Sequence, residues 1–129
     1  MSGLTKMEQR GIRMAGKVLL AAFQGEPMCF VHVLLNALDM KEKGFEVKVV
    51  IEGSATQAAA ELGDPGKPFA KIYQRVRDEG LIDCACQACS AKTGALPALQ
   101  AQGLGMCAAM SGHPSLAKYI EQGYQGVTF

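Results

Sequence analysis

The sequence predicts a single α/β domain, a three-layer sandwich in which helices cover both faces of a mostly parallel sheet of about five strands. The chain has 129 residues, of which 49% are apolar and 19% charged, a size and composition typical of one globular domain. Short runs rich in Val, Ile and Leu alternate along the chain with segments of helical periodicity. Strands that alternate with helices form parallel sheets through right-handed crossovers, which predicts this architecture.

The first strand is expected at residues 17–23, a continuous apolar run of the kind found in strands buried on both faces. The run stops at residues 24–27, and Pro27 suits the first turn of a helix that we expect to reach Lys43. Gly44 supplies the end of that helix. Residues 46–51 are rich in Val and predict the second strand.

Two further helices are expected before the middle of the sheet. Ser54 and Gln57 have the spacing of a capping box in front of an Ala-rich helix at 55–62. A turn cluster at 64–68 then precedes a helix at 69–79, because apolar side chains recur there on one face.

The second half predicts three more strands, at 81–86, at 103–107 and at about 126–128. In the first of these, Cys84 and Cys86 must point to the same side, since side chains alternate with a period of two. Cys89 is expected at the start of a short helix. A last helix is expected at 114–122, with Pro114 in its first turn and His113 as its N-cap.

Charge and hydropathy exclude several classes of protein. Thirteen basic and twelve acidic side chains give a net charge of +1, which argues against a dedicated nucleic-acid binder. The apolar run at 18–23 is shorter than a signal-peptide core, and no stretch approaches the about 20 apolar residues of a membrane span. We therefore expect a cytoplasmic protein without membrane contact, with an N-terminal extension at 1–16 and the domain at 17–129.

Ligands of open parallel sheets bind beyond the carboxyl ends of the strands. In this chain the segments that follow the first four strands should therefore share one edge of the sheet. The residues that we expect to line this crevice, besides the cysteines, are Gln24, Glu52, Ser54, Gln87 and His113.

The cysteines are the unusual feature of the sequence. The chain has five, and three of them, Cys84, Cys86 and Cys89, lie within six residues. Cys86 falls just before a helix N-terminus, where free N–H groups and the helix dipole favour thiolate. A thiolate there is a nucleophile toward sulfane sulfur or a disulfide. Cys29 and Cys107 are instead expected in the core, because cysteine is among the most buried residue types.

Two other interpretations of the cluster stay open. Cys84, Cys86 and Cys89 could supply three thiolates to a zinc ion or an iron–sulfur cluster, with Cys107 or His113 as the fourth ligand. Alternatively, the cysteines are only structural and the protein is an oligomeric binding module without catalysis. The wide apolar arcs of the helices favour assembly with a partner subunit in any of these cases.

The chain from about Lys17 to Phe129 resembles the DsrE/DsrF-like family of small sulfur-relay proteins. The resemblance lies in residues 17–21 (Lys-Val-Leu-Leu-Ala), 46–53 (Glu-Val-Lys-Val-Val-Ile-Glu-Gly), 79–86 (Glu-Gly-Leu-Ile-Asp-Cys-Ala-Cys) and 116–124 (Leu-Ala-Lys-Tyr-Ile-Glu-Gln-Gly-Tyr). It implies an α/β sandwich, assembly into trimers or hexamers, and a persulfide on Cys86 that passes between protein thiols. Cys84 and Cys89 lie outside the family pattern, and Gln87 stands where a small residue is often found.

The leading hypothesis from the sequence is a cytoplasmic sulfur carrier or sulfurtransferase-like protein without a resident cofactor. In this hypothesis Cys86 bears the persulfide, and Cys84 or Cys89 resolves it as a disulfide. The expected partners are further copies of the chain and the proteins that donate and accept the sulfur.

Overall fold

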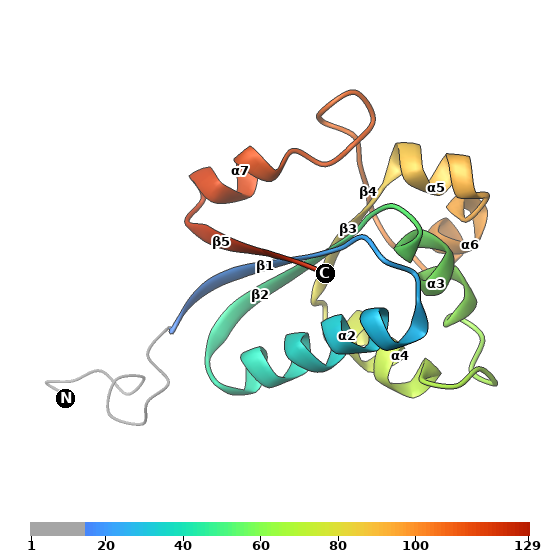
Figure 1. Ribbon diagram of the computed structural model, residues 1–129, viewed down its shortest axis with the longest axis horizontal. Coiled ribbons are helices and arrows are strands. Elements are labelled where there is room, and N and C mark those ends of the chain that lie inside the picture. The colour runs from blue at the N-terminus through green and yellow to red at the C-terminus, as the bar shows by residue number, and fades with distance from the viewer. Residues whose placement is uncertain (1–14) are drawn as a thin grey trace, which may run out of the picture.

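The computed structural model describes residues 15–129 (Figure 1), so the expected extension at 1–16 lies almost entirely outside the described residues. Strands and helices alternate along most of the described chain, as the sequence predicts. In chain order they are β1 (Gly16–Ala22), α2 (Pro27–Glu42), β2 (Phe45–Ile51), α3 (Ala55–Glu61), α4 (Ala70–Asp78), β3 (Ile82–Cys86), α5 (Gln87–Thr93), α6 (Leu96–Ala101), β4 (Met106–Cys107), α7 (Leu116–Glu121) and β5 (Tyr124–Thr128).

The five strands form one sheet in the order β4-β3-β2-β1-β5, and every neighbouring pair is parallel. β1 pairs with β2 along its whole length, from Gly16 opposite Phe45 to Ala22 opposite Ile51. The expected α/β sandwich with a parallel sheet of five strands is therefore confirmed. The parallel order brings the carboxyl ends of β1, β2 and β3 to the same edge, where the functional residues are expected.

The two faces of the sheet carry cores of unequal size. Helices α2 and α4 lie on one side of the sheet and α7 on the other (Figure 1). The larger core lies under α2, α3 and α4, and the smaller one lies under α7. The smaller core consists of Leu19, Val50, Cys84, Tyr119 and Tyr124. Because side chains alternate along β3, Cys86 lies on the same face as Cys84, the face that α7 covers.

A glutamine joins three of the helices on the larger side. The Tyr73 hydroxyl of α4 donates to Oε1 of Gln102, 2.5 Å away, and Nε2 of Gln102 donates to the Ala59 carbonyl of α3 at 3.0 Å. Gln102 follows the last residue of α6, a helix that the sequence does not predict. One amide side chain thus fixes α3, α4 and the end of α6 relative to one another.

Two expected caps are wrong. Ser54 makes no side-chain cap on α3; its hydroxyl instead accepts from the Gly25 N–H at 2.8 Å and donates to the Phe23 carbonyl at 3.2 Å, which joins the ends of β1 and β2. The last helix begins at Leu116 with Ser115 at its N-cap position, so His113 is not the cap. The backbone turns before Pro114, and this turn leaves His113 available for a different role.

Among the described residues, no helix is long and apolar enough to cross a membrane.

Candidate functional site

Three side chains from separate segments meet at the carboxyl end of β3. Cys86 is the last residue of β3, Cys89 lies in the first turn of α5, and His113 precedes α7. Nδ1 of His113 lies 3.1 Å from Sγ of Cys86 and 3.8 Å from Sγ of Cys89. Cys86 is fully buried, whereas Cys89 and His113 are half-buried. We call these three residues the thiol–imidazole cluster.

The start of α5 fixes the position of the two thiols. Cys86 is the N-cap of this helix, and its Sγ accepts a hydrogen bond from the Cys89 N–H at 3.3 Å. The buried Ser90 hydroxyl donates to the Cys86 carbonyl at 2.7 Å and so ties the first turn of the helix to the strand. The sequence Cys86-Gln-Ala-Cys89 therefore places both sulfur atoms at one helix end, as its spacing predicts.

A tight turn at residues 110–113 places the His113 imidazole beside the two thiols. Met110 and His113 are joined by two backbone hydrogen bonds, and the central residues Ser111 and Gly112 have φ of 50° and 89°. Positive φ at both central positions is the mark of a type I′ turn, which favours Gly at the second of them. The Gly112 carbonyl accepts from the Ala88 N–H at 2.9 Å, so α5 holds the turn directly above the thiols.

Burial controls the ionisation of Cys86. Desolvation, followed by the hydrogen bond and charge of Cys89 and the charge of Glu52, raises the pKa of the Cys86 thiol to about 11, although the Cys89 N–H lowers it. The N–H at the helix N-terminus thus lowers the pKa of Cys86 as expected, but burial and the neighbouring groups raise it by more. At neutral pH the Cys86 thiol is therefore almost entirely protonated. A reaction at Cys86 therefore needs a group that removes the proton, and His113 lies within hydrogen-bond distance.

Glu52 is an uncommon buried carboxylate near this site. Only 7% of Glu52 is exposed, and its Oε2 has no hydrogen-bond partner among the described residues. Burial raises the pKa of Glu52, and its charge is close enough to raise the pKa of Cys86. The expectation that this residue lines the crevice agrees with its place at the end of β2.

The structure corrects the roles of the other cysteines. Cys84 is joined to Cys107 by a disulfide, with their Cα atoms 5.6 Å apart. In this state Cys84 can neither resolve a persulfide nor ligate a metal, and Cys107 is a half-buried partner on β4 rather than a core thiol. Cys29, also expected in the core, is a half-buried free thiol in the first turn of α2. Sequence spacing could not reveal the pairing, because it depends on β4 lying beside β3.

The remaining predicted crevice residues do not join the cluster. Gln24 and Gln87 are exposed, and neither side chain makes a hydrogen bond to another residue of the described part of the chain, 15–129. Ser54 is engaged with Gly25 and Phe23. Among the predicted lining residues, the structure thus brings His113 to the thiols and Glu52 within electrostatic reach of them.

The thiol–imidazole cluster also fits a metal ion. The three potential ligand atoms, two Sγ and one Nδ1, all lie within 4.8 Å of one another. Around tetrahedral zinc, with bonds of about 2.3 Å to sulfur and 2.0 Å to nitrogen, ligand atoms stand about 3.5–4 Å apart. The set is Cys86, Cys89 and His113, and not the three cysteines that the sequence suggests.

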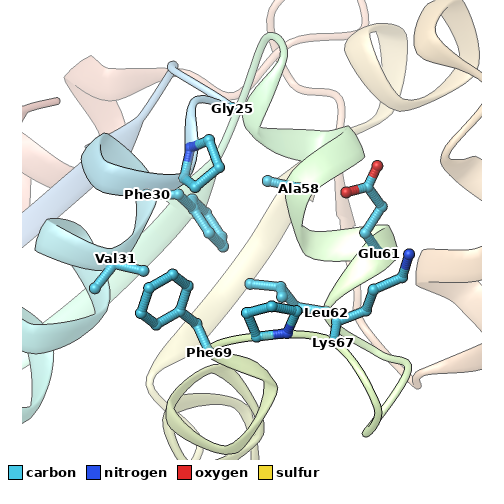
Figure 2. Close-up of a pocket in the computed structure, with 10 residues that line it drawn as sticks. Gly25, Phe30, Val31, Ala58, Glu61, Leu62, Lys67 and Phe69 are labelled. Carbon is cyan, nitrogen blue, oxygen red and sulfur yellow. The ribbon is translucent and has the colours of Figure 1, made fainter.

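A second hollow lies on the other side of the sheet, between α2, α3 and the segment before α4 (Figure 2). Its volume is about 260 Å³. Phe30, Val31 and Phe69 point into it, and Glu61 and Lys67 lie along its edge (Figure 2). None of the cysteines lines this hollow, so it is separate from the thiol–imidazole cluster.

No family model matches the chain. No solved structure matches it either. Two curated archaeal proteins do. An uncharacterized protein of Archaeoglobus fulgidus is 40% identical over 61 residues, which are 47% of this chain and 98% of that protein. The uncharacterized protein MJ0733 of Methanocaldococcus jannaschii is 33% identical over 95 residues, which are 74% of this chain and 75% of that protein. With that identity over three quarters of both sequences, the chain belongs to the same family as MJ0733.

Proposed function

We propose that the protein carries sulfane sulfur as a persulfide on Cys86. The observation that carries this proposal is the pair formed by the Cys86 thiol and His113 Nδ1, 3.1 Å apart, with a second free thiol, Cys89, beside it. A thiol paired with a histidine is the usual arrangement of an activated sulfur nucleophile. The resemblance of residues 17–129 to sulfur-relay proteins favours the same chemistry.

Loading begins with removal of the thiol proton. His113, when its own proton is on Nε2, accepts the Cys86 proton at Nδ1, and the resulting thiolate attacks the outer sulfur of a donor persulfide. A bond forms between Cys86 Sγ and that sulfur, the S–S bond of the donor breaks, and the donor thiolate leaves with a proton. The Cys89 N–H, 3.3 Å from Cys86 Sγ, stabilises the thiolate during the attack.

Unloading has two routes that differ in electron balance. An acceptor thiolate can attack the outer sulfur, which forms an S–S bond on the acceptor, breaks the S–S bond at Cys86 and restores the Cys86 thiolate. The sulfane sulfur then sits on the acceptor as a persulfide, with no net oxidation or reduction. Alternatively, the Cys89 thiolate attacks the inner sulfur on Cys86, which forms a Cys86–Cys89 disulfide and releases the outer sulfur as sulfide. In that second route the two cysteines are oxidised and the carried sulfur is reduced by two electrons.

The setting that we propose follows the sequence hypothesis. The protein would act in the cytoplasm, as a trimer or hexamer, between a protein that donates sulfane sulfur and one that accepts it. Whether it turns over as a sulfurtransferase or acts only as a carrier depends on how fast these partners exchange.

Intact-mass analysis tests the proposal. After treatment with a small persulfide donor, the protein should gain about 32 Da, one sulfur atom, and lose it on reduction. Cys86→Ser should abolish the adduct, whereas Cys29→Ser, which removes a distant free thiol, should leave it unchanged. Cys89→Ser should retain the adduct longer than the wild type, because internal resolution is lost. Native protein that never gains the adduct would contradict the proposal.

A thiolate metal site is the second candidate, and the spacing of the three ligand atoms within 4.8 Å favours it. Cys86, Cys89 and His113 would hold zinc through three protein ligands with one position open. Elemental analysis of protein purified without chelator separates the two candidates. About one zinc per chain that disappears in His113→Ala would favour the metal site, and protein free of zinc and iron that accepts sulfur would favour the carrier.

A further inference from the structure

We propose that Cys84 and Cys107 form a second dithiol couple that re-reduces the Cys86–Cys89 disulfide, so that four of the five cysteines constitute an internal electron relay. The inference rests on the proposed function, since the Cys86–Cys89 disulfide is the product of its reductive route. It gives a function to the Cys84–Cys107 disulfide, which takes no part in the loading or unloading of sulfur at Cys86.

The geometry of β3 and β4 carries the inference. Cys86 and Cys107 are register partners on these parallel strands, so their side chains point to the same face of the sheet. Cys84 points to that face as well and is bonded to Cys107 across the same strand pair. Neighbouring strands lie about 4.8 Å apart, which falls within the Cα separations of about 4.4–6.8 Å that a disulfide spans. Cys107 therefore lies beside both Cys84 and Cys86 on the neighbouring strand, so either of them is a neighbour with which its sulfur could exchange.

The exchange balances in two steps. In the first, the Cys107 thiolate attacks Cys86 Sγ in the Cys86–Cys89 disulfide, and Cys89 leaves and takes up a proton. In the second, the Cys84 thiolate attacks Cys107 Sγ in the Cys86–Cys107 intermediate, and Cys86 leaves and takes up a proton. Cys84 and Cys107 lose two electrons and two protons, and Cys86 and Cys89 gain them.

The groups around the four sulfur atoms can take part in the proton transfers of the exchange, and their burial determines where an external dithiol can attack. His113 Nδ1 lies 3.1 Å and 3.8 Å from the two thiols that receive protons. The Tyr119 hydroxyl lies 3.4 Å from Cys84 Sγ and donates its proton to Asp83 Oδ2, which itself lies 3.9 Å from Cys84 Sγ and can take up the Cys84 proton. Cys84 is buried, whereas Cys107 is half-buried on the two-residue edge strand β4, so an external dithiol reaches the second couple at Cys107.

The resting state that the relay predicts is the state observed: Cys84 and Cys107 are joined, and Cys86 and Cys89 are free. Disulfides in reducing compartments are usually transient and take part in catalysis or redox sensing. An external dithiol then reduces the Cys84–Cys107 bond and completes the cycle.

Trapping of the intermediate tests the relay without any sulfur donor, so its outcome is independent of the persulfide experiment. In Cys84→Ser the second step is blocked, and peptide mapping of oxidised, alkylated protein should show a Cys86–Cys107 disulfide. In Cys107→Ser the Cys86–Cys89 disulfide should persist, because Cys84 is two residues from Cys86 on one strand and no partner relays the exchange. Cys29→Ser serves as the matched control and should behave as the wild type.

A kinetic measurement completes the test. Fully reduced wild-type protein receives one equivalent of a thiol oxidant, and samples are quenched by alkylation. We expect the disulfide to move from Cys86–Cys89 to Cys84–Cys107 at a rate independent of protein concentration. At equilibrium, protein with the Cys84–Cys107 disulfide should exceed protein with the Cys86–Cys89 disulfide by at least about tenfold. For a two-electron couple this ratio corresponds to a difference in reduction potential of about 30 mV. Absence of the Cys86–Cys107 bond in Cys84→Ser, or exchange that needs a second molecule, would overturn the relay whether or not Cys86 accepts sulfur.

Discussion

Cys86 experiences two opposing influences within a few ångströms. The Cys89 N–H in the first turn of α5 favours the thiolate, but complete burial, the Cys89 side chain and the Glu52 carboxylate favour the neutral thiol. Because burial and the two neighbouring groups outweigh the N–H, the Cys86 thiol is mostly protonated at neutral pH. In the proposed mechanism His113 removes this proton. Such a thiol reacts slowly with general reagents and faster with a substrate that fits the site.

The ionisation of Cys86 gives a prediction at the residue scale. Because the pKa of Cys86 is raised to about 11, its thiolate fraction rises about tenfold with each unit increase in pH until that value is reached. The rate of Cys86 alkylation by iodoacetamide, followed by peptide mapping, should therefore keep rising from pH 8 to beyond pH 10. Glu52→Gln removes a carboxylate charge and should shift the profile to lower pH by less than about one unit. A plateau near pH 8 in the wild type would contradict this explanation.

At the residue scale the sequence predicted Cys86, Cys89, Glu52 and His113 at one edge of the sheet, but the N-cap role that it predicted for His113 is wrong. The spacing of Pro114 predicts an N-cap, whereas the type I′ turn at Ser111 and Gly112 directs His113 to the thiols. The Ser-Gly dipeptide is a turn signal that could have suggested this. The partner of a turn residue, however, depends on tertiary contacts that local spacing does not contain.

At the scale of elements, the turns after β1 and β2 pack closely against each other. The Gly25 N–H donates to the Ser54 hydroxyl, and a Cβ at Gly25 would lie 2.3 Å from the Ser54 carbonyl oxygen. Close approach of backbone to backbone thus requires glycine at this position. The contact holds the entry to α2 against the entry to α3.

Gly25→Ala should consequently destabilise the fold. The added methyl group collides with backbone that has little freedom to shift, and overpacking of this kind costs about 1–3 kcal/mol. Urea unfolding followed by circular dichroism measures the loss. Gly126→Ala is the matched control, because a Cβ there meets no atom within 4 Å, and it should leave the free energy of unfolding within about 0.5 kcal/mol of the wild type. Equal stability of the two variants would rule out the close approach.

The sequence predicted most elements within a few residues, because hydrophobic runs and helical periodicity are local properties. β1, α2 and β2 follow directly from such patterns. The helix α6 was not predicted because its six residues are too few to show a period and only one of them, Gln100, is polar. The capping box at Ser54 failed because the hydroxyl found tertiary partners instead.

At the scale of the whole molecule, the Cys84–Cys107 disulfide closes a large loop. The two residues are 23 positions apart, and the loop between them includes α5 and α6. The Cys84–Cys107 pairing could not be predicted from the sequence, because it depends on β4 lying beside β3 in the sheet. The parallel topology itself was predictable from the alternation of elements.

Reduction of this disulfide should lower the stability of the whole domain. Loop closure over about 24 residues corresponds to about 3.5 kcal/mol, which for a domain of this size is a decrease in Tm of about 10 °C. Thermal unfolding with and without a dithiol reductant measures the difference. Cys107→Ser should already unfold at the lower temperature and show no further response to reductant. A Tm that reductant leaves unchanged in the wild type would argue against a stabilising bond.

The double hydrogen bond of Gln102 has a consequence for motion. Because one amide joins Tyr73 of α4 to Ala59 of α3, the helices on the larger side of the sheet resist independent displacement. The opposite side has the smaller core, and its short helix α7 is reached through the segment that carries His113. We therefore expect local opening of the fold mainly on the side of the sheet that α7 covers. Amide hydrogens of α7 should exchange with solvent before those of α2, and substrates should approach Cys86 from that side.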